Sequence, residues 1–196
     1  EGELIIPRNK HLLISPFTTR RIFEKLIHNE IEAAQAGKKA QITAKMNSLE
    51  DPDMIQLLYK ASQAGVKIRM IVRGFTCLIP GVEGLSENIY MTSIVDRYLE
   101  HGRIYLFHNG GDEQMYIGSA DWMTRNLDRR IEVLTPIYDP DLFAELKDIL
   151  VLQLADNVKA RIQDAEETNA YVKQKTGDKR IRSQYEIYDY LKLKNN

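Results

Sequence analysis

Residues 11–72 alternate between short apolar runs and helical patterns, and this alternation constrains the fold more than any other feature. The runs HLLIS (11–15), AQITAKM (40–46) and VKIRMIV (66–72) have the length and composition of strands. Apolar residues at helical spacing predict a helix before Gly37, and Asp51-Pro52 opens a second helix that stops at Gly65. Strand–helix–strand repeats favour parallel strands with crossover helices, so we predict an α/β fold with its ligand site at the carboxyl ends of strands.

The remaining sequence predicts a loop, further strands and a helical tail. Residues 74–88 are rich in glycine and lack periodicity, which indicates a loop over a site. We expect a short helix at 93–100, strands at 103–108, 114–118 and 130–137, a tight turn at 109–112, a helix from Asp139-Pro140 to about 155, and a tail over 157–196 that packs on the domain and ends in a helix near 185–193.

Composition limits the classes of function. The chain has 196 residues, which suits one domain, and its net charge of -1 disfavours a dedicated nucleic-acid-binding protein. It contains no apolar run of about 18 residues that would predict a transmembrane segment. The single cysteine, Cys77, cannot form an intrachain disulfide and favours a reducing, cytoplasmic setting. Because the chain opens with Glu1 rather than Met, we expect it to be part of a longer protein.

One of the four histidines stands out as a candidate for chemistry. We interpret His11, His28 and His108 as surface or core residues, which is the commoner role of a lone histidine. His101 lies between a predicted helix and a predicted strand, and a glycine and Arg103 follow it. A strand end would direct both side chains to one place.

A second polar motif follows the strand at 114–118. Gly118 and Ser119 are small enough to let backbone N–H groups approach an anion, and Ser119 and Asp121 offer short polar groups that could orient an imidazole. A polar turn held by salt bridges is the simpler alternative. Together with His101, this motif resembles the His-x-Lys and Gly-Ser-x-Asn pattern of the phospholipase D superfamily. Arg103 replaces the lysine and Asp121 the asparagine, which argues against ordinary phosphodiester hydrolysis.

Several blocks in order make the resemblance more specific. These blocks are LLISP (12–16), KMNSL (45–49), IVRGFTCLIPG (71–81), SIVDRYLEH (93–101) and SADWM (119–123). With them, the whole chain is similar to the last domain of bacterial polyphosphate kinase, the ATP-using type.

The family implies a phospholipase D-like mixed sheet flanked by helices, here the second of two such halves, spanning 1–196. It implies an enzyme that reversibly moves the terminal phosphate of ATP onto inorganic polyphosphate through a phosphohistidine in an upstream domain. The expected partners are ATP or ADP, polyphosphate and the upstream domains of the same chain, in a homo-oligomer. Mg²⁺ is expected as a cofactor with its ligands mainly upstream, so we predict no metal site in this chain. We expect a cytoplasmic protein, leave peripheral membrane association open, and expect the isolated chain to be inactive.

The resemblance also implies site residues. His101 is the predicted catalytic residue, and Arg73, His101 and Arg130 are predicted to contact ATP phosphates. Arginine suits this role because its fork binds phosphate through two hydrogen bonds. Without the resemblance, an ion pair with a carboxylate would explain either arginine. In supporting positions we place Lys45, Asn47, Arg103, Ser119, Asp121 and Arg125.

Two other functions are open alternatives. A phospholipase D-like phosphodiesterase or nuclease could complete its single motif by forming a homodimer. A non-catalytic polyanion-binding module is the second alternative. The basic residues Lys173, Lys175, Lys179, Arg180 and Arg182 could guide polyphosphate, although a solvated surface is the simpler interpretation.

Overall fold

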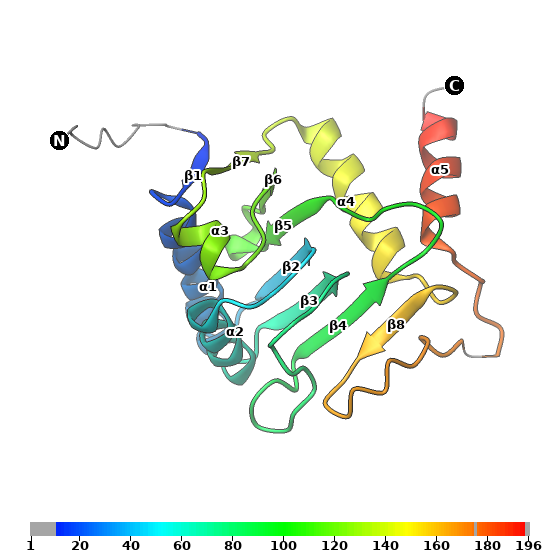
Figure 1. Cartoon of the computed structure of the whole chain (residues 1–196), viewed down its shortest axis with the longest axis horizontal. Coiled ribbons are helices and arrows are strands. Elements are labelled where there is room, and N and C mark those ends of the chain that lie inside the picture. Colours follow the sequence, from blue (N-terminus) through cyan, green and yellow to red (C-terminus); the bar gives the residue numbers. More distant parts are fainter. Residues whose placement is uncertain (1–10, 175, 195–196) are drawn as a thin grey trace.

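An eight-stranded mixed sheet organises the chain (Figure 1). The computed structural model describes residues 11–174 and 176–194. The strands are β1 (Leu13–Ser15), β2 (Gln41–Met46), β3 (Lys67–Val72), β4 (Ile89–Ile94), β5 (Arg103–Phe107), β6 (Gln114–Gly118), β7 (Glu132–Pro136) and β8 (Ala160–Gln163). Their order in the sheet is β1-β7-β6-β5-β2-β3-β4-β8. Strands β2, β3 and β4 are parallel to one another, and the other neighbouring strands pair antiparallel. The predicted α/β class with a mixed sheet is confirmed.

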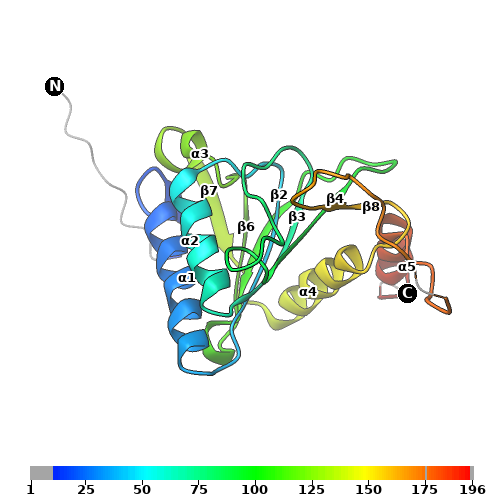
Figure 2. The same ribbon diagram turned by 90° about the horizontal axis from the view of Figure 1, so that it is seen from below.

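Helices cover both faces of the sheet. They are α1 (Thr19–Gln35), α2 (Pro52–Gln63), α3 (Thr124–Asp128), α4 (Pro140–Leu154) and α5 (Ser183–Lys194), with a 3-10 turn η1 (Asn109–Gly111). Figure 2 shows α1 and α2 together on one face, α4 on the other, and α5 beyond α4. None of the helices in the described part of the chain is both long and apolar enough to cross a membrane.

The larger hydrophobic core lies between the sheet and α1 and α2. Phe23 of α1 is fully buried, and its ring centroid lies 4.7 Å from that of Tyr105 and 5.7 Å from that of Trp122. The rings of Tyr105 and Trp122 are stacked with their centroids 5.2 Å apart. A smaller core forms under α4 from Ile104, Leu106, Met115 and Leu150. Both faces of β5 are therefore buried, which fixes the strand that follows His101.

The start of α2 is held by a buried ion pair. Asp51 caps the helix by accepting a hydrogen bond from the Met54 N–H, at 3.0 Å, and Pro52 is the first helical residue, as predicted. Both carboxylate oxygens of Asp51 also accept from Arg20, at 2.9 and 2.6 Å, and Thr124 Oγ1 donates to one of them at 2.9 Å. Burial alone would raise the pKa of Asp51, but the hydrogen bonds from Arg20, Met54 and Thr124 outweigh it and lower the pKa.

The predicted helix at 93–100 is wrong. Ser93 and Ile94 end β4, where they pair with Arg161 and Ala160 of β8, and residues 95–102 form a loop. Ser93 could cap a helix, and the apolar residues that follow it lie at helical spacing, but the pairing of Ser93 and Ile94 with β8 keeps the start of this segment in a strand. Strands β4 and β8 and helix α3 were not predicted.

The first strand also differs from the expectation. The strand–helix alternation predicted parallel pairing of residues 11–15 with the next strand. Instead β1 pairs antiparallel with β7 at the far edge of the sheet, with Leu13 opposite Leu134. Strands β2 and β3 pair in parallel as predicted, so the rule held for only part of the chain.

Gly118 permits the close approach of β6 and β7. A Cβ atom built on Gly118 would lie 2.3 Å from the Val133 carbonyl oxygen and 2.7 Å from Leu134 Cα, both backbone atoms. Any side chain here must push the two strands apart. The small residue therefore serves strand packing, whereas the sequence had suggested backbone access for an anion.

Replacing Asp51 should cost stability in a pH-dependent way. The folded-state pKa of Asp51 lies below its ordinary value of about 3.9. Ionised Asp51 therefore stabilises the folded chain above that pH, and the contribution is lost as the pH falls through the folded-state pKa. We expect Asp51→Asn to lower the free energy of unfolding by about 3 kcal/mol at pH 7 and to weaken its decline below about pH 5, measured by urea unfolding.

Asp53→Asn is the matched control. The Asp53 side chain is 85% exposed and lies 4.0 Å from Arg20, so its loss should change the free energy of unfolding by less than about 1 kcal/mol. Equal urea midpoints for the two variants at pH 7 would contradict the role given to Asp51.

A methyl group at Gly118 should also destabilise the chain. We expect Gly118→Ala to lower the free energy of unfolding by about 2 kcal/mol or more, because the displaced atoms belong to the backbone of β7. Gly102→Ala is the control, since its Cβ would meet only Lys45 Nζ, at 3.8 Å. Thermal unfolding of both variants gives the comparison, and an unchanged midpoint for Gly118→Ala would show that the strands can separate without penalty.

Candidate functional site

The register of the sheet brings the predicted site residues to one edge. The carboxyl ends of β2, β3 and β4 lie there, together with the amino ends of β5 and β7 and the carboxyl end of β6. Lys45, Asn47, Arg73, His101, Arg103, Ser119, Asp121, Arg125 and Arg130 all lie on these strand ends or on the loops and helix α3 next to them. We call this edge the site edge.

Three loops at the site edge are joined by backbone hydrogen bonds. The Leu49 N–H donates to the Phe75 carbonyl at 3.1 Å, and the Cys77 N–H donates to the Leu49 carbonyl at 2.8 Å. The Trp122 carbonyl accepts from the N–H groups of Glu50 and Asp51, at 2.9 and 3.0 Å. The loops after β2, β3 and β6 therefore form one ordered floor.

A buried carboxylate connects Arg103 to Asn47. Asp121 is 4% exposed, and its oxygens accept from Arg103 Nε and Nη2, at 3.0 and 3.2 Å, and from the Asn47 N–H, at 2.8 Å. Arg103 Nη1 donates to the His101 carbonyl at 2.8 Å. The sequence had suggested that Asp121 orients an imidazole, but its carboxylate holds Arg103, and Arg103 holds the backbone of His101.

Ser119 is committed to the sheet. Its N–H donates to the Val133 carbonyl at 3.2 Å, and its Oγ accepts from the Val133 N–H at 3.3 Å. Together with the Arg103–Asp121 ion pair, these contacts fit the simpler interpretation of the motif as a polar turn held by a salt bridge.

Arg73 reaches across to the loop after β2. Its Nη2 donates to Asn47 Oδ1, and the Gly74 N–H donates to the Asn47 carbonyl at 2.7 Å. A Cβ on Gly74 would lie 2.7 Å from that carbonyl oxygen, so glycine is required for the approach. Arg73 Nε is buried and has no hydrogen-bond partner within the described residues. Arg73 also lines a cavity of about 250 Å³ with residues 94–100.

Lys45 is neutralised by a residue that the sequence did not single out. Its Nζ donates to Glu100 Oε2 at 2.7 Å, and both side chains are almost fully buried. The same carboxylate accepts from Gln153 Nε2 at 2.8 Å and from Gln184 Nε2 at 2.8 Å. Glu100 could have been noticed as the neighbour of His101, but nothing in the sequence connects it to Gln153 or Gln184.

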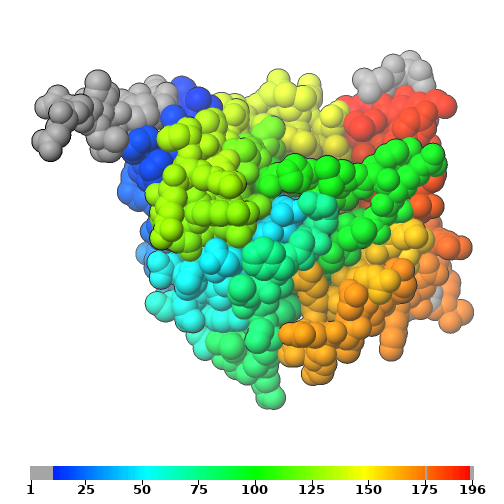
Figure 3. All heavy atoms as spheres, in the orientation of Figure 1, coloured from blue at the N-terminus to red at the C-terminus, as the bar shows by residue number. Residues whose placement is uncertain are grey.

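His101 itself is exposed at the end of the loop after β4. Within the part of the chain that the structure describes, its imidazole makes no hydrogen bond or ion pair. In Figure 3 this loop, in green, crosses the face of the molecule from the C-terminal helix, in red, toward the region of α3, in yellow-green.

The arginine in α3 and the two arginines that follow this helix are exposed to solvent. Arg125, Arg129 and Arg130 are exposed, and their guanidinium groups form no ion pair with any described residue. Arg125 and Arg129 line a cavity of about 490 Å³ together with Glu50, Phe75, Met123 and Thr124. Arg129 and Phe75 were not predicted. Arg130 lies at the same edge but lines neither this cavity nor that of Arg73.

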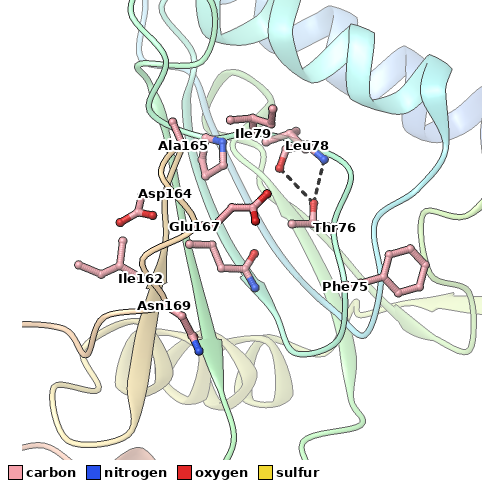
Figure 4. Close-up of a pocket in the computed structure, with 11 residues that line it drawn as sticks. Phe75, Thr76, Leu78, Ile79, Ile162, Asp164, Ala165, Glu167 and Asn169 are labelled. Atoms are coloured by element: carbon pink, nitrogen blue, oxygen red, sulfur yellow. Dashed lines mark hydrogen bonds between the residues drawn. The ribbon is translucent and has the colours of Figure 1, made fainter.

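Arg73, His101 and Arg130 thus share the site edge, and their convergence on one cleft stays a prediction. A further cavity, of about 340 Å³, lies between residues 75–80 and 162–169 (Figure 4). None of the predicted site residues lines it. Across residues 11–174 and 176–194, no cluster of three or more His, Cys, Asp or Glu is placed to hold a metal ion.

Comparisons with known proteins identify the family of this chain. A family profile described as "Polyphosphate kinase C-terminal domain 2" matches residues 12–184. A polyphosphate kinase of Vibrio parahaemolyticus is 54% identical over 182 residues, which are 93% of this chain and 26% of that protein. The chain therefore spans about a quarter of the length of the curated relatives that it matches.

Solved structures give the same family and the wider fold. The crystal structure of polyphosphate kinase from Porphyromonas gingivalis matches with a TM-score of 0.92 and 46% identity, covering 95% of this chain and 28% of that one. A phospholipase D family member, Nuc from Salmonella typhimurium, shares the fold alone, with a TM-score of 0.54 and 15% identity over 78% of this chain and 96% of that one. The chain belongs to the polyphosphate kinase family, as its C-terminal domain 2.

Proposed function

We propose that this chain forms one wall of an ATP and polyphosphate site in a longer polyphosphate kinase. The complete enzyme would reversibly transfer the terminal phosphoryl group of ATP to inorganic polyphosphate. Family membership supports the reaction, and the site edge supports the part given to this chain. Because the chain spans only 26% of its Vibrio relative, most of the proposed enzyme lies outside it.

The proposal depends chiefly on the position and contacts of the Arg73 side chain. Its buried Nε lacks a partner among the described residues, and its Nη2 is anchored on Asn47. A phosphate oxygen would satisfy the free donor. Phosphoryl transfer spreads negative charge over the phosphate oxygens, so catalysis relies on fixed cationic donors. A rigid arginine beside the His101 loop meets that requirement.

The proposed transfer proceeds in two steps. The bond between the terminal phosphorus and the oxygen of ADP breaks as a bond from phosphorus to a histidine nitrogen outside this chain forms. The phosphorus–nitrogen bond then breaks as a terminal oxygen of polyphosphate attacks. His101 would act on the leaving oxygen of ADP, either by protonating it or by anchoring it. Arg103 would hold the His101 backbone through the contact to its carbonyl.

Magnesium would enter with the nucleotide. Bound Mg²⁺ would neutralise part of the phosphate charge. We place its protein ligands outside this chain, because Asp121 and Glu100 are already paired with Arg103 and Lys45, and no group of three or more His, Cys, Asp or Glu among the described residues could hold a metal ion.

The isolated chain should not phosphorylate itself. The nucleophilic histidine implied by the family is none of His11, His28, His101 and His108. We expect no acid-labile label after incubation with γ-labelled ATP and magnesium. Near-stoichiometric label that is lost in His101→Ala would make His101 the nucleophile and overturn this assignment.

Replacing His101 should impair turnover of the complete enzyme. A proton-transfer role predicts a loss of roughly 10²- to 10⁴-fold in kcat for His101→Ala and His101→Gln. An anchoring role predicts mainly a higher KM for ATP. We favour the loss in kcat. Polyphosphate synthesis measured across pH separates the two roles.

His108→Gln is the control for these variants. His108 follows β5 at the opposite edge of the sheet, where its nearest ionic neighbour is Glu113 at 3.8 Å. Its replacement should leave kcat and KM unchanged. Near-normal kinetics for both His101 variants would remove His101 from the chemistry.

A further inference from the structure

The loop that carries His101 is held by polar contacts rather than by packing. We call residues 95–102 the His101 loop. Its large apolar side chains point to solvent, with Val95 68%, Tyr98 62% and Leu99 70% exposed. A loop that buries so little apolar surface gains little stability from hydrophobic packing. Its conformation must therefore depend on hydrogen bonds and ion pairs to its neighbours.

Those partners come mainly from the C-terminal segment. Gln184 Oε1 accepts from the Tyr98 N–H at 3.0 Å, and Gln184 Nε2 donates to the Tyr98 carbonyl at 2.8 Å. One side-chain amide thus pairs with both backbone groups of Tyr98, as a neighbouring strand would. The Nε2 group also donates to Glu100 Oε1 at 2.8 Å, one residue before His101.

A neighbouring ion pair supports the same arrangement. Arg182 Nε and Nη2 donate to the carboxylate of Asp96, at 2.8 and 2.6 Å, and the Asp96 side chain is almost fully buried. The hydrogen bond from Arg182 lowers the pKa of Asp96. In Figure 1 the loop after β4 extends to the start of α5 before it returns to β5.

The start of α5 is itself fixed in place. Asp156 is buried, and its Oδ2 accepts from the Ser183 N–H and Oγ, at 2.8 and 2.7 Å. Its Oδ1 accepts from the backbone N–H groups of residues 158–160. Ser183 is fully buried, so Gln184 projects from a rigid support.

We propose that Gln184 is a positioning residue: it holds Tyr98 and Glu100 and thereby fixes the orientation of His101 in the His101 loop. This inference rests on the proposed role of His101 in the ATP site. Glu100 is fixed at its other oxygen by Lys45 and Gln153. Arg103 holds the His101 carbonyl, so the residue is fixed on both sides only while Gln184 is present.

Gln184→Ala in the complete kinase tests the proposal. We expect kcat for polyphosphate synthesis to fall by about 10- to 100-fold, because displacement of a catalytic group by about 1 Å costs that much. Hydrogen–deuterium exchange of the peptide spanning 95–102 should become at least about tenfold faster, as its restraints are lost. Gln184→Glu keeps the shape of the side chain and the acceptor for the Tyr98 N–H, but it loses the donor and places a second negative charge beside Glu100. It should therefore show the same losses as Gln184→Ala, and it tests the proposal if Gln184→Ala folds poorly.

Tyr190→Phe is the matched control on the same helix. The Tyr190 hydroxyl donates to Asp148 Oδ2 at 2.8 Å and joins α5 to α4 without touching the His101 loop. It should leave kcat and exchange at 95–102 unchanged. An equal loss of activity in Tyr190→Phe would mean that general docking of α5 matters, and it would overturn the positioning role.

A His101→Ala background separates this inference from the proposed function. If Gln184 acts through His101, adding Gln184→Ala to His101→Ala should reduce the residual kcat no further. An additional tenfold loss, normal kcat for both Gln184 variants, or unchanged exchange at 95–102 would each overturn the inference. Normal kcat and KM for His101→Ala would instead overturn the proposed role of His101.

Discussion

The buried carboxylate of Asp121 sets the relative positions of three strand ends. It accepts from Asn47 after β2 and from Arg103 at the start of β5, and it follows β6 itself. A buried charge costs several kcal/mol unless it is paired, so this arrangement persists only with both donors present. Arg103 and Asp121 are also the two departures from the phospholipase D motif. They form one ion pair, in which the cation of Arg103 neutralises the negative charge that the aspartate adds.

The predictable parts of the fold are those in which local signals and tertiary contacts agree. Asp51-Pro52 marked the start of α2, and the alternation of β2, α2 and β3 gave parallel pairing. The prediction missed strand β4 because part of its pairing comes from β8, whose residues lie about seventy positions later. The predicted parallel pairing of β1 was wrong because its place in the sheet depends on a distant strand, β7. Neither pairing leaves a mark in a local window of sequence.

The candidate site divides in the same way. His101 and Arg73 could be selected because glycine and strand ends surround them in the sequence. Asp121 and Arg103 were selected as well, but their contact with each other could not be read from spacing. The roles of Glu100 and Gln184 required the structure, since glutamine on a C-terminal helix is among the least informative residues in a sequence. Whether Arg130 joins Arg73 and His101 around one ligand stays a prediction.

The dependence of the His101 loop on α5 has a consequence for how the chain folds. Arg182 and Gln184 lie 86 positions after their partners Asp96 and Tyr98, so these contacts close long stretches of chain. Contacts of such separation form late, because the entropy of closing the chain must be overcome before they stabilise anything. During synthesis the central strands can pair while the ribosome still holds α5. The His101 loop becomes ordered only after α5 has emerged, so a chain that stops before α5 would have a nearly complete sheet and an unanchored His101 loop.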